Sequence, residues 1–142
     1  MAQFRVEGID DVLKRLEKLS DRSKIDAIAK KAVNEAKNVV CESTKSAVRA
    51  SEKGPYSTGS IAASIEVTDA RINSYGVFVV ARPTGRDDRG VRNGEKAAYL
   101  EYGKYSTTHM EARPWRANAV SNSEAKAKEI IENVVTKEMQ LE

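Results

Sequence analysis

Few residues of this 142-residue chain could perform catalysis. Catalysis requires a nucleophile beside a base or a pair of carboxylates in a pocket, and the sequence shows neither pattern. His109 is the only histidine, so a metal site with two histidine ligands is excluded, and we expect a structural or merely exposed side chain. Asp87 and Asp88 could bind a divalent cation, but Arg86 and Arg89 flank them and would oppose its charge. The sequence predicts no enzyme, no metal and no other cofactor.

Two further patterns favour structure over chemistry. The segment from Gly54 to Gly59 lacks the lysine of a phosphate-binding loop, so we expect a turn at Gly54-Pro55. One or two helical turns should follow, capped by the Thr58 hydroxyl. Cys41 is the only cysteine, which excludes an intrachain disulfide, favours a reducing compartment and predicts a small buried thiol.

The segment from Thr84 to Lys96 is rich in charge and glycine and has a single apolar side chain. It cannot bury enough surface to order itself, so the sequence predicts a long mobile loop over residues 83–96. Its cations, together with the residue that precedes it, are Arg82, Arg86, Arg89, Arg92 and Lys96. Three interpretations stay open: a solvated loop, a contact with another protein, or a contact with nucleic acid, which the lack of an aromatic residue between these cations disfavours.

The elements that would position these residues are organised around a stretch from Ala97 to Ala119. Gly103 can adopt the left-handed conformation that ends a short helix. Pro114 suits the first turn of the last helix, because proline has no backbone N–H and the N–H groups of that turn have no partner within the helix. Trp115, the only tryptophan, should be buried where that helix begins. Glu101 and Arg113 flank the segment between the two helices and could form a salt bridge across it.

The rest of the chain alternates helical and strand patterns. Apolar periodicity predicts three helices, over Ile9–Leu19, Ser23–Ser51 and Pro114–Met139, and Ser23 with Asp26 should form a capping pair for the second. It also predicts strands over Gln3–Glu7, Glu66–Ile72 and Tyr75–Arg82. The last two strands should form a hairpin with its turn at Asn73-Ser74. The run Val77–Ala81 is apolar on both faces and should be the most buried strand. The last helix shows apolar residues near a heptad repeat: Ala117, Val120, Ala127, Ile131, Val134 and Leu141. We therefore predict one α+β domain over residues 1–142, with N-terminal helices and a C-terminal helix packed on a small antiparallel sheet.

Composition limits the function classes. Charged residues make up 32% of the chain with a net charge of +3, too small to indicate a dedicated nucleic-acid binder. No apolar run approaches the roughly 18 residues of a membrane span, and the N-terminus lacks a signal-peptide profile. We expect a soluble protein made in the cytosol, with no membrane partner.

Three motifs follow the N-terminal strand and the long Ala/Lys helix in a fixed order. They are Pro55…Thr58-Gly59-Ser60-Ile61…Ser64-Ile65, then Ala98-Tyr99-Leu100-Glu101-Tyr102-Gly103, then Met110-Glu111-Ala112-Arg113-Pro114-Trp115…Ala119. In this order and spacing the chain resembles the tail-component, or neck, family of long-tailed bacteriophages, typified by the tenth gene product of phage HK97. The family usually has threonine, phenylalanine and a long or basic residue where this chain has Lys104, Trp115 and Ser60.

The resemblance implies a non-enzymatic virion protein that acts in tail completion and head–tail joining and is assembled in the cytoplasm of the bacterial host. It implies a homo-oligomer, with a ring as the natural product of one repeated heterologous contact. Its partners would be neighbouring connector and tail proteins, with at most non-specific contact with passing DNA. The structural residues would be Thr58, Gly59, Tyr99, Glu101, Gly103, Arg113, Pro114 and Trp115, and the interface residues Arg86, Arg89 and Arg92. The alternative is a small nucleic-acid-binding module that uses the arginine-rich loop, which salt-dependent DNA binding would reveal.

Overall fold

The computed structural model describes residues 2–4, 9–10, 22–52, 58–105 and 109–140. Their elements are β1 (Ala2–Phe4), α2 (Arg22–Ser51), α3 (Ser60–Ala63), β2 (Ile65–Val67), β3 (Arg71–Asn73), β4 (Gly76–Pro83), α4 (Asn93–Tyr102), β5 (Lys104–Tyr105), β6 (His109–Met110) and α5 (Arg116–Gln140). The α+β class is confirmed. Ile9 and Asp10 are helical, while the rest of the helix predicted up to Leu19 lies outside the described residues, as does the end of the strand predicted up to Glu7.

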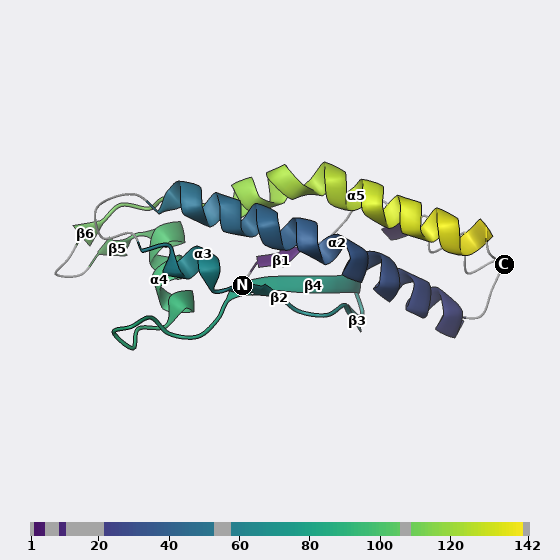
Figure 1. The fold of residues 1–142 in the computed structure, drawn as a ribbon, viewed down its shortest axis with the longest axis horizontal. Helices are drawn as coiled ribbons and strands as arrows, with labels where there is room; N and C mark the ends of the chain where they lie inside the picture. Colours follow the sequence, from purple (N-terminus) through teal and green to yellow (C-terminus); the bar gives the residue numbers. More distant parts are fainter. Residues whose placement is uncertain (1, 5–8, 11–21, 53–57, 106–108, 141–142) are drawn as a thin grey trace.

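The two long helices, α2 and α5, lie side by side and antiparallel over most of their length (Figure 1). Lys31 of α2 pairs with Glu138 near the end of α5, and the Ser51 hydroxyl at the other end of α2 lies 3.5 Å from the Pro114 carbonyl oxygen. Small residues such as Ala32 and Ala127, both fully buried, line the contact. Their size allows the two backbones to approach closely, so the pair forms a narrow, continuous core.

Buried residues of α5 recur at every fourth position: Ala119, Ser123, Ala127, Ile131 and Val135. The heptad prediction is therefore wrong in its first two positions, since Ala117 is exposed and Val120 is 39% exposed. A hydrophobicity pattern does not detect this four-residue repeat, because one of its members, Ser123, is polar. Its hydroxyl donates to the Ala119 carbonyl at 2.8 Å, which satisfies it inside the core.

Strand β4 is the centre of the sheet. Ala81 pairs with Ala2 of β1 on one edge and with Val67 of β2 on the other. Strand β3 continues β2 along the same edge, but the register shifts by one residue between them, so residues 68–70 form a bulge. The predicted hairpin is confirmed, although its turn lies at residues 74–75 because Asn73 still pairs with Gly76.

Side-chain oxygens satisfy the backbone amides around the bulge. The Val80 amide donates to the Thr68 hydroxyl at 3.0 Å, and the Ala70 amide donates to the side-chain oxygen of Asn34 on α2 at 2.8 Å. Lys37 of α2 pairs with Asp69 at 2.7 Å, which lowers the pKa of that carboxyl below its ordinary value. These contacts attach the irregular edge of the sheet to the long helix above it.

The helix–sheet core gathers the buried face of β4, represented by Val79 and Ala81, under α2 and the second half of α5. Phe78 and Val80, on the other face of the strand, are half-buried. Long helix α2 ends at Ser51 as predicted, and Ser23, the predicted cap, is the second residue of the described helix. Within the described residues, no helix is both long and apolar enough to span a bilayer.

The close packing of α2 and α5 leads to a stability prediction. Ala127→Leu adds three carbon atoms at a fully buried position, and we expect it to lower the free energy of unfolding by about 1–3 kcal/mol through overpacking. Ala125→Leu, on the exposed side of the same helix, is the matched control and should change it by less than about 0.5 kcal/mol. Urea denaturation measures both, and equal effects would mean that the helices do not pack closely there.

Candidate interaction surface

The short elements α3, α4, β5 and β6 gather at one end of the molecule, where α2 ends and α5 begins (Figure 1). A second core cluster holds them together, and it joins Val48 of α2, Ile61 of α3, Leu100 of α4 and Trp115 with Ala119 at the start of α5. Cys41 packs against this cluster as a half-buried thiol, in line with the predicted structural role. Most of the residues that the sequence analysis singled out therefore lie at this end of the molecule.

Trp115 is 1% exposed, which confirms the predicted anchor, and its indole N–H donates to the Ala97 carbonyl at 3.1 Å. The helix begins one residue later than this tryptophan, because the Ala119 amide donates to the Trp115 carbonyl and Arg116 is the first helical residue. The predicted start at Pro114 is therefore two residues early.

The Glu101 carboxylate caps α5 from a different helix. Its Oε2 accepts hydrogen bonds from the amides of Trp115 at 2.8 Å and Arg116 at 3.1 Å. These amides belong to the unpaired first turn, whose partial positive charge favours an anion, and such a cap contributes about 0.5–2 kcal/mol. The segment before it is also attached to α4, since the Arg113 amide donates to the Leu100 carbonyl at 2.6 Å. The predicted salt bridge between Glu101 and Arg113 stays a prediction.

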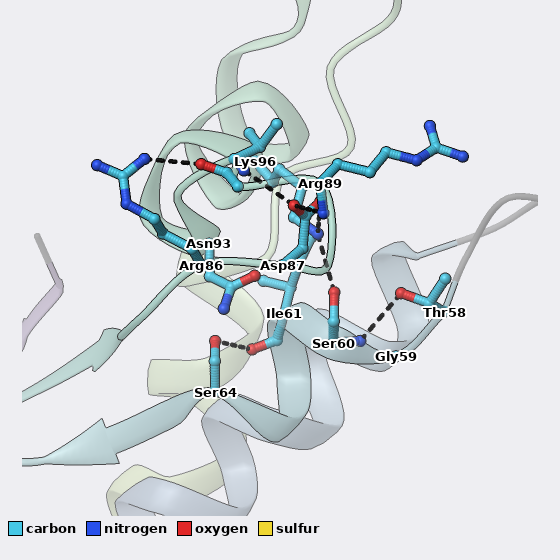
Figure 2. Close-up of polar contacts among 12 residues, drawn as sticks. Thr58, Gly59, Ser60, Ile61, Ser64, Arg86, Asp87, Arg89, Asn93 and Lys96 are labelled. Atoms are coloured by element: carbon cyan, nitrogen blue, oxygen red, sulfur yellow. Dashed lines mark hydrogen bonds and ion pairs between the residues drawn. The ribbon is translucent and has the colours of Figure 1, made fainter.

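A second glutamate does the same for α3. Glu52, just after α2, accepts hydrogen bonds from the amides of Gly59 at 3.1 Å and Ala62 at 3.3 Å. The predicted cap, Thr58, lies one residue too early, because Gly59 is the N-cap with a φ of 74°. The Thr58 hydroxyl lies 3.4 Å from the Ser60 amide (Figure 2), a longer contact than either hydrogen bond to Glu52. The sequence analysis missed Glu52 because this residue lies seven and ten residues before the amides that it caps, outside the local capping pattern.

Asp87 organises the arginine-rich loop (Figure 2). Its Oδ1 accepts from the amides of Arg89 and Val91, both at 2.9 Å, and its Oδ2 lies 3.1 Å from the Lys96 ammonium. Lys96 also donates to the Ser60 hydroxyl at 2.8 Å, so one side chain links the loop, α3 and α4. The loop predicted up to Lys96 ends earlier, because α4 begins at Asn93, and a charged carboxylate stands where the loop lacks an apolar core. The predicted mobility of the loop stays a prediction.

These contacts change the titration of the carboxyl. The hydrogen bond from the Val91 amide, and then that from Lys96, hold the pKa of Asp87 below its ordinary value. A depressed folded pKa means that the stabilisation is present above the unfolded pKa and is lost as pH falls through the folded one. The loop therefore keeps its shape at neutral pH and should loosen only in acid, below about pH 4.

The three arginines chosen from the sequence are exposed but do not point the same way. Arg86 and Arg92 pair across a single β-bridge, and Arg86 donates to the Gly90 carbonyl at 2.7 Å. Arg89 extends away from Arg86 on the other side of the loop (Figure 2). Val91, between Arg89 and Arg92, is 36% exposed. The loop thus presents cations around a partly exposed apolar side chain.

The segment after α4 is fixed by Gly103. Its φ of 80° confirms that a glycine ends α4, but its ψ of 174° lies outside the left-handed helical region that the sequence predicted. A Cβ at this position would lie 2.8 Å from the Met110 carbonyl oxygen. Tyr99, one turn earlier, donates a hydrogen bond from its hydroxyl to Glu95 at 2.6 Å, and this hydrogen bond raises the pKa of Tyr99.

His109 is exposed and its ring lies 5.2 Å from that of Tyr105. Within the described residues, no group of three His, Cys, Asp or Glu side chains could hold a metal.

Residues 10–103 match the model of a protein family described as "Bacteriophage HK97-gp10, putative tail-component". The chain belongs to this HK97-gp10-like family of phage tail components. No match was found among curated proteins or among solved structures. The resemblance inferred from the three motifs is thereby confirmed at the level of the family.

The match to the tail-component family includes the loop and α4 and ends at Gly103, so β5, β6 and α5 lie beyond it. The third motif, around Trp115, is nevertheless attached to matched residues. Ala97, Leu100 and Glu101, all of α4, bind it through the hydrogen bonds described above. The sequence of α4 in this family member thus specifies where the last helix begins.

The role of Asp87 can be tested by proteolysis. Asp87→Ala removes the acceptor of two amides and one ammonium, so trypsin should cleave at Arg86, Arg89 or Arg92 on the order of tenfold faster than in the wild type. Asp88→Ala, at the adjacent exposed position, is the control and should leave the rate unchanged. Equal cleavage of both variants would contradict the assigned role of Asp87.

Proposed function

We propose that this tail component acts in tail completion and head–tail joining, as a homo-oligomeric ring within the virion. The family supports a role in the phage tail. The finer proposal is carried by one observation: an exposed loop with three arginines is held in shape by Asp87 and Lys96. A contact loop that is already ordered loses less conformational entropy on binding than a disordered one.

The shape of the molecule fits a repeated contact between unlike surfaces. The loop end, built from α3, α4 and the β5–β6 hairpin, lies at one end of the long α2–α5 pair and not on the outer faces of those helices (Figure 1). A contact between unlike surfaces is heterologous, and a heterologous contact that closes on itself produces a ring. Partners on either side of the ring would be connector and tail proteins. The proposal requires no enzymatic activity.

The arginine loop can be tested directly. Replacing Arg86, Arg89 and Arg92 together by serine should change the melting temperature by less than about 3 °C, since exposed charges contribute little to stability. The same change should lower the yield of joined, infectious particles by about tenfold or more when it replaces the wild-type gene in the phage, because each subunit loses several contacts.

The matched control removes three exposed cations from α2 instead, as Lys24→Ser, Lys30→Ser and Arg49→Ser. It should leave both the melting temperature and the particle yield unchanged. Head–tail joining by the loop variant at the wild-type yield would refute the role of the loop in assembly.

A further inference from the structure

A patch of three exposed aromatic side chains and two half-buried cationic side chains surrounds the turn between α4 and the β5–β6 hairpin. We call it the tyrosine patch, and its members are Tyr102, Lys104, Tyr105, His109 and Arg116. Tyr102 is 62% exposed and Tyr105 is 76% exposed, both far more than a side chain that serves the core. Isolated exposed aromatics are common, but these two share one turn and lie beside cations.

The tyrosine patch is held in place before any partner binds. Arg116 donates to the Tyr102 hydroxyl at 2.7 Å, and its guanidinium lies over the rings of Tyr102 and Trp115 at 5.4 and 5.5 Å. The Lys104 ammonium lies 5.0 Å from the centre of the Tyr99 ring. Tyrosine and arginine are enriched among residues that dominate binding energy, and fixed side chains lose little entropy on binding.

The patch carries two cations, Lys104 and Arg116, whose described contacts are to aromatic rings and a tyrosine hydroxyl. Glu101 uses its Oε2 on the two amides at the start of α5, which leaves Lys104 and Arg116 without a carboxylate among their described contacts. A partner that fits this patch therefore has carboxylates beside a surface that tyrosine rings can cover.

The outer face of α5 offers those carboxylates. Glu129 and Glu132 are exposed, three positions apart, on the side of the helix opposite the buried Ala127 and Ile131. Ala125 lies on the same exposed side, and its small side chain leaves a flat surface that a tyrosine ring can cover. The other long helix does not fit, since α2 carries seven lysines and arginines against three acidic residues, whereas α5 carries four of each.

The same chain cannot make this contact with itself. Sixteen residues separate Arg116 from Glu132, which at a rise of 1.5 Å per residue corresponds to about 24 Å along a rigid helix. We propose that the tyrosine patch of one copy docks on the outer face of α5 of a second copy, with Lys104 and Arg116 facing Glu129 and Glu132. This inference rests on the proposed ring and names the two surfaces that form it. Each copy carries both surfaces, so the contact is heterologous and repeats around a ring.

The test is a charge exchange measured by self-association. Light scattering and sedimentation of the purified full chain should show that Lys104→Glu, Tyr105→Ala and the pair Glu129→Lys with Glu132→Lys each weaken assembly by about tenfold or more. Combining Lys104→Glu with Glu129→Lys alone should recover assembly to within about threefold of the wild type, because Lys104 and Glu129 then exchange charges while Arg116 still faces Glu132. Lys24→Glu, the same charge change at an exposed position of α2, should have no effect. A melting curve for each variant establishes that it is folded.

Each result decides the proposal. A wild-type chain that assembles while all patch variants assemble equally well would overturn the docking surfaces and leave the proposed ring intact. Weakened variants that the charge exchange does not recover would show that the patch contacts some surface other than α5, and would also overturn it. A wild-type chain that stays monomeric at all concentrations, alone and with phage tails, would overturn both the surfaces and the ring.

Discussion

The close antiparallel packing of α2 and α5 is the constraint on which the rest of the structure depends. Alanines and hydroxyl residues along both helices allow a short interhelical distance, and Ser123 and Thr44 satisfy their own hydroxyls on the preceding turn. This packing fixes where α5 begins relative to the end of α2. The position of Trp115 follows from it, and α4 then packs against that tryptophan. The loop and the tyrosine patch are therefore held by a core that lies outside them.

Carboxylates stabilise the short elements of this fold, which in a larger protein would be stabilised by a larger apolar core. Glu52, Glu101 and Asp87 each accept hydrogen bonds from two backbone amides at a helix start or a tight loop. Each bond stabilises local order that short elements could not maintain by burial alone. Asp87 also pairs with the Lys96 ammonium, so the same carboxylate attaches the loop to α4. An ordered, cationic end of the molecule results, and this is what the proposed assembly role requires.

The sequence predicted those features that depend on local chemistry. Periodicity located α2 and its end at Ser51, and the glycine at position 103 with the proline at position 114 indicated the limits of the segment before Trp115. The order of three motifs was enough to indicate the tail-component family. Features that depend on distant contacts were missed. No local pattern shows that Glu101 would cap a helix fourteen residues later, or that Lys96 would bind both Asp87 and Ser60. The loop was expected to be mobile because composition alone does not reveal an ionic centre.

The central claim is that the end formed by the loop, α4 and the β5–β6 hairpin is the contact surface of the assembled tail component. Hydrogen–deuterium exchange of the isolated chain, compared with the same chain inside purified phage tails, tests it most directly. We predict that residues 84–105 are protected further in the assembled particle, while the core of α2 around Ala32 exchanges equally slowly in both. Equal exchange of residues 84–105 in the free and assembled states would contradict the account.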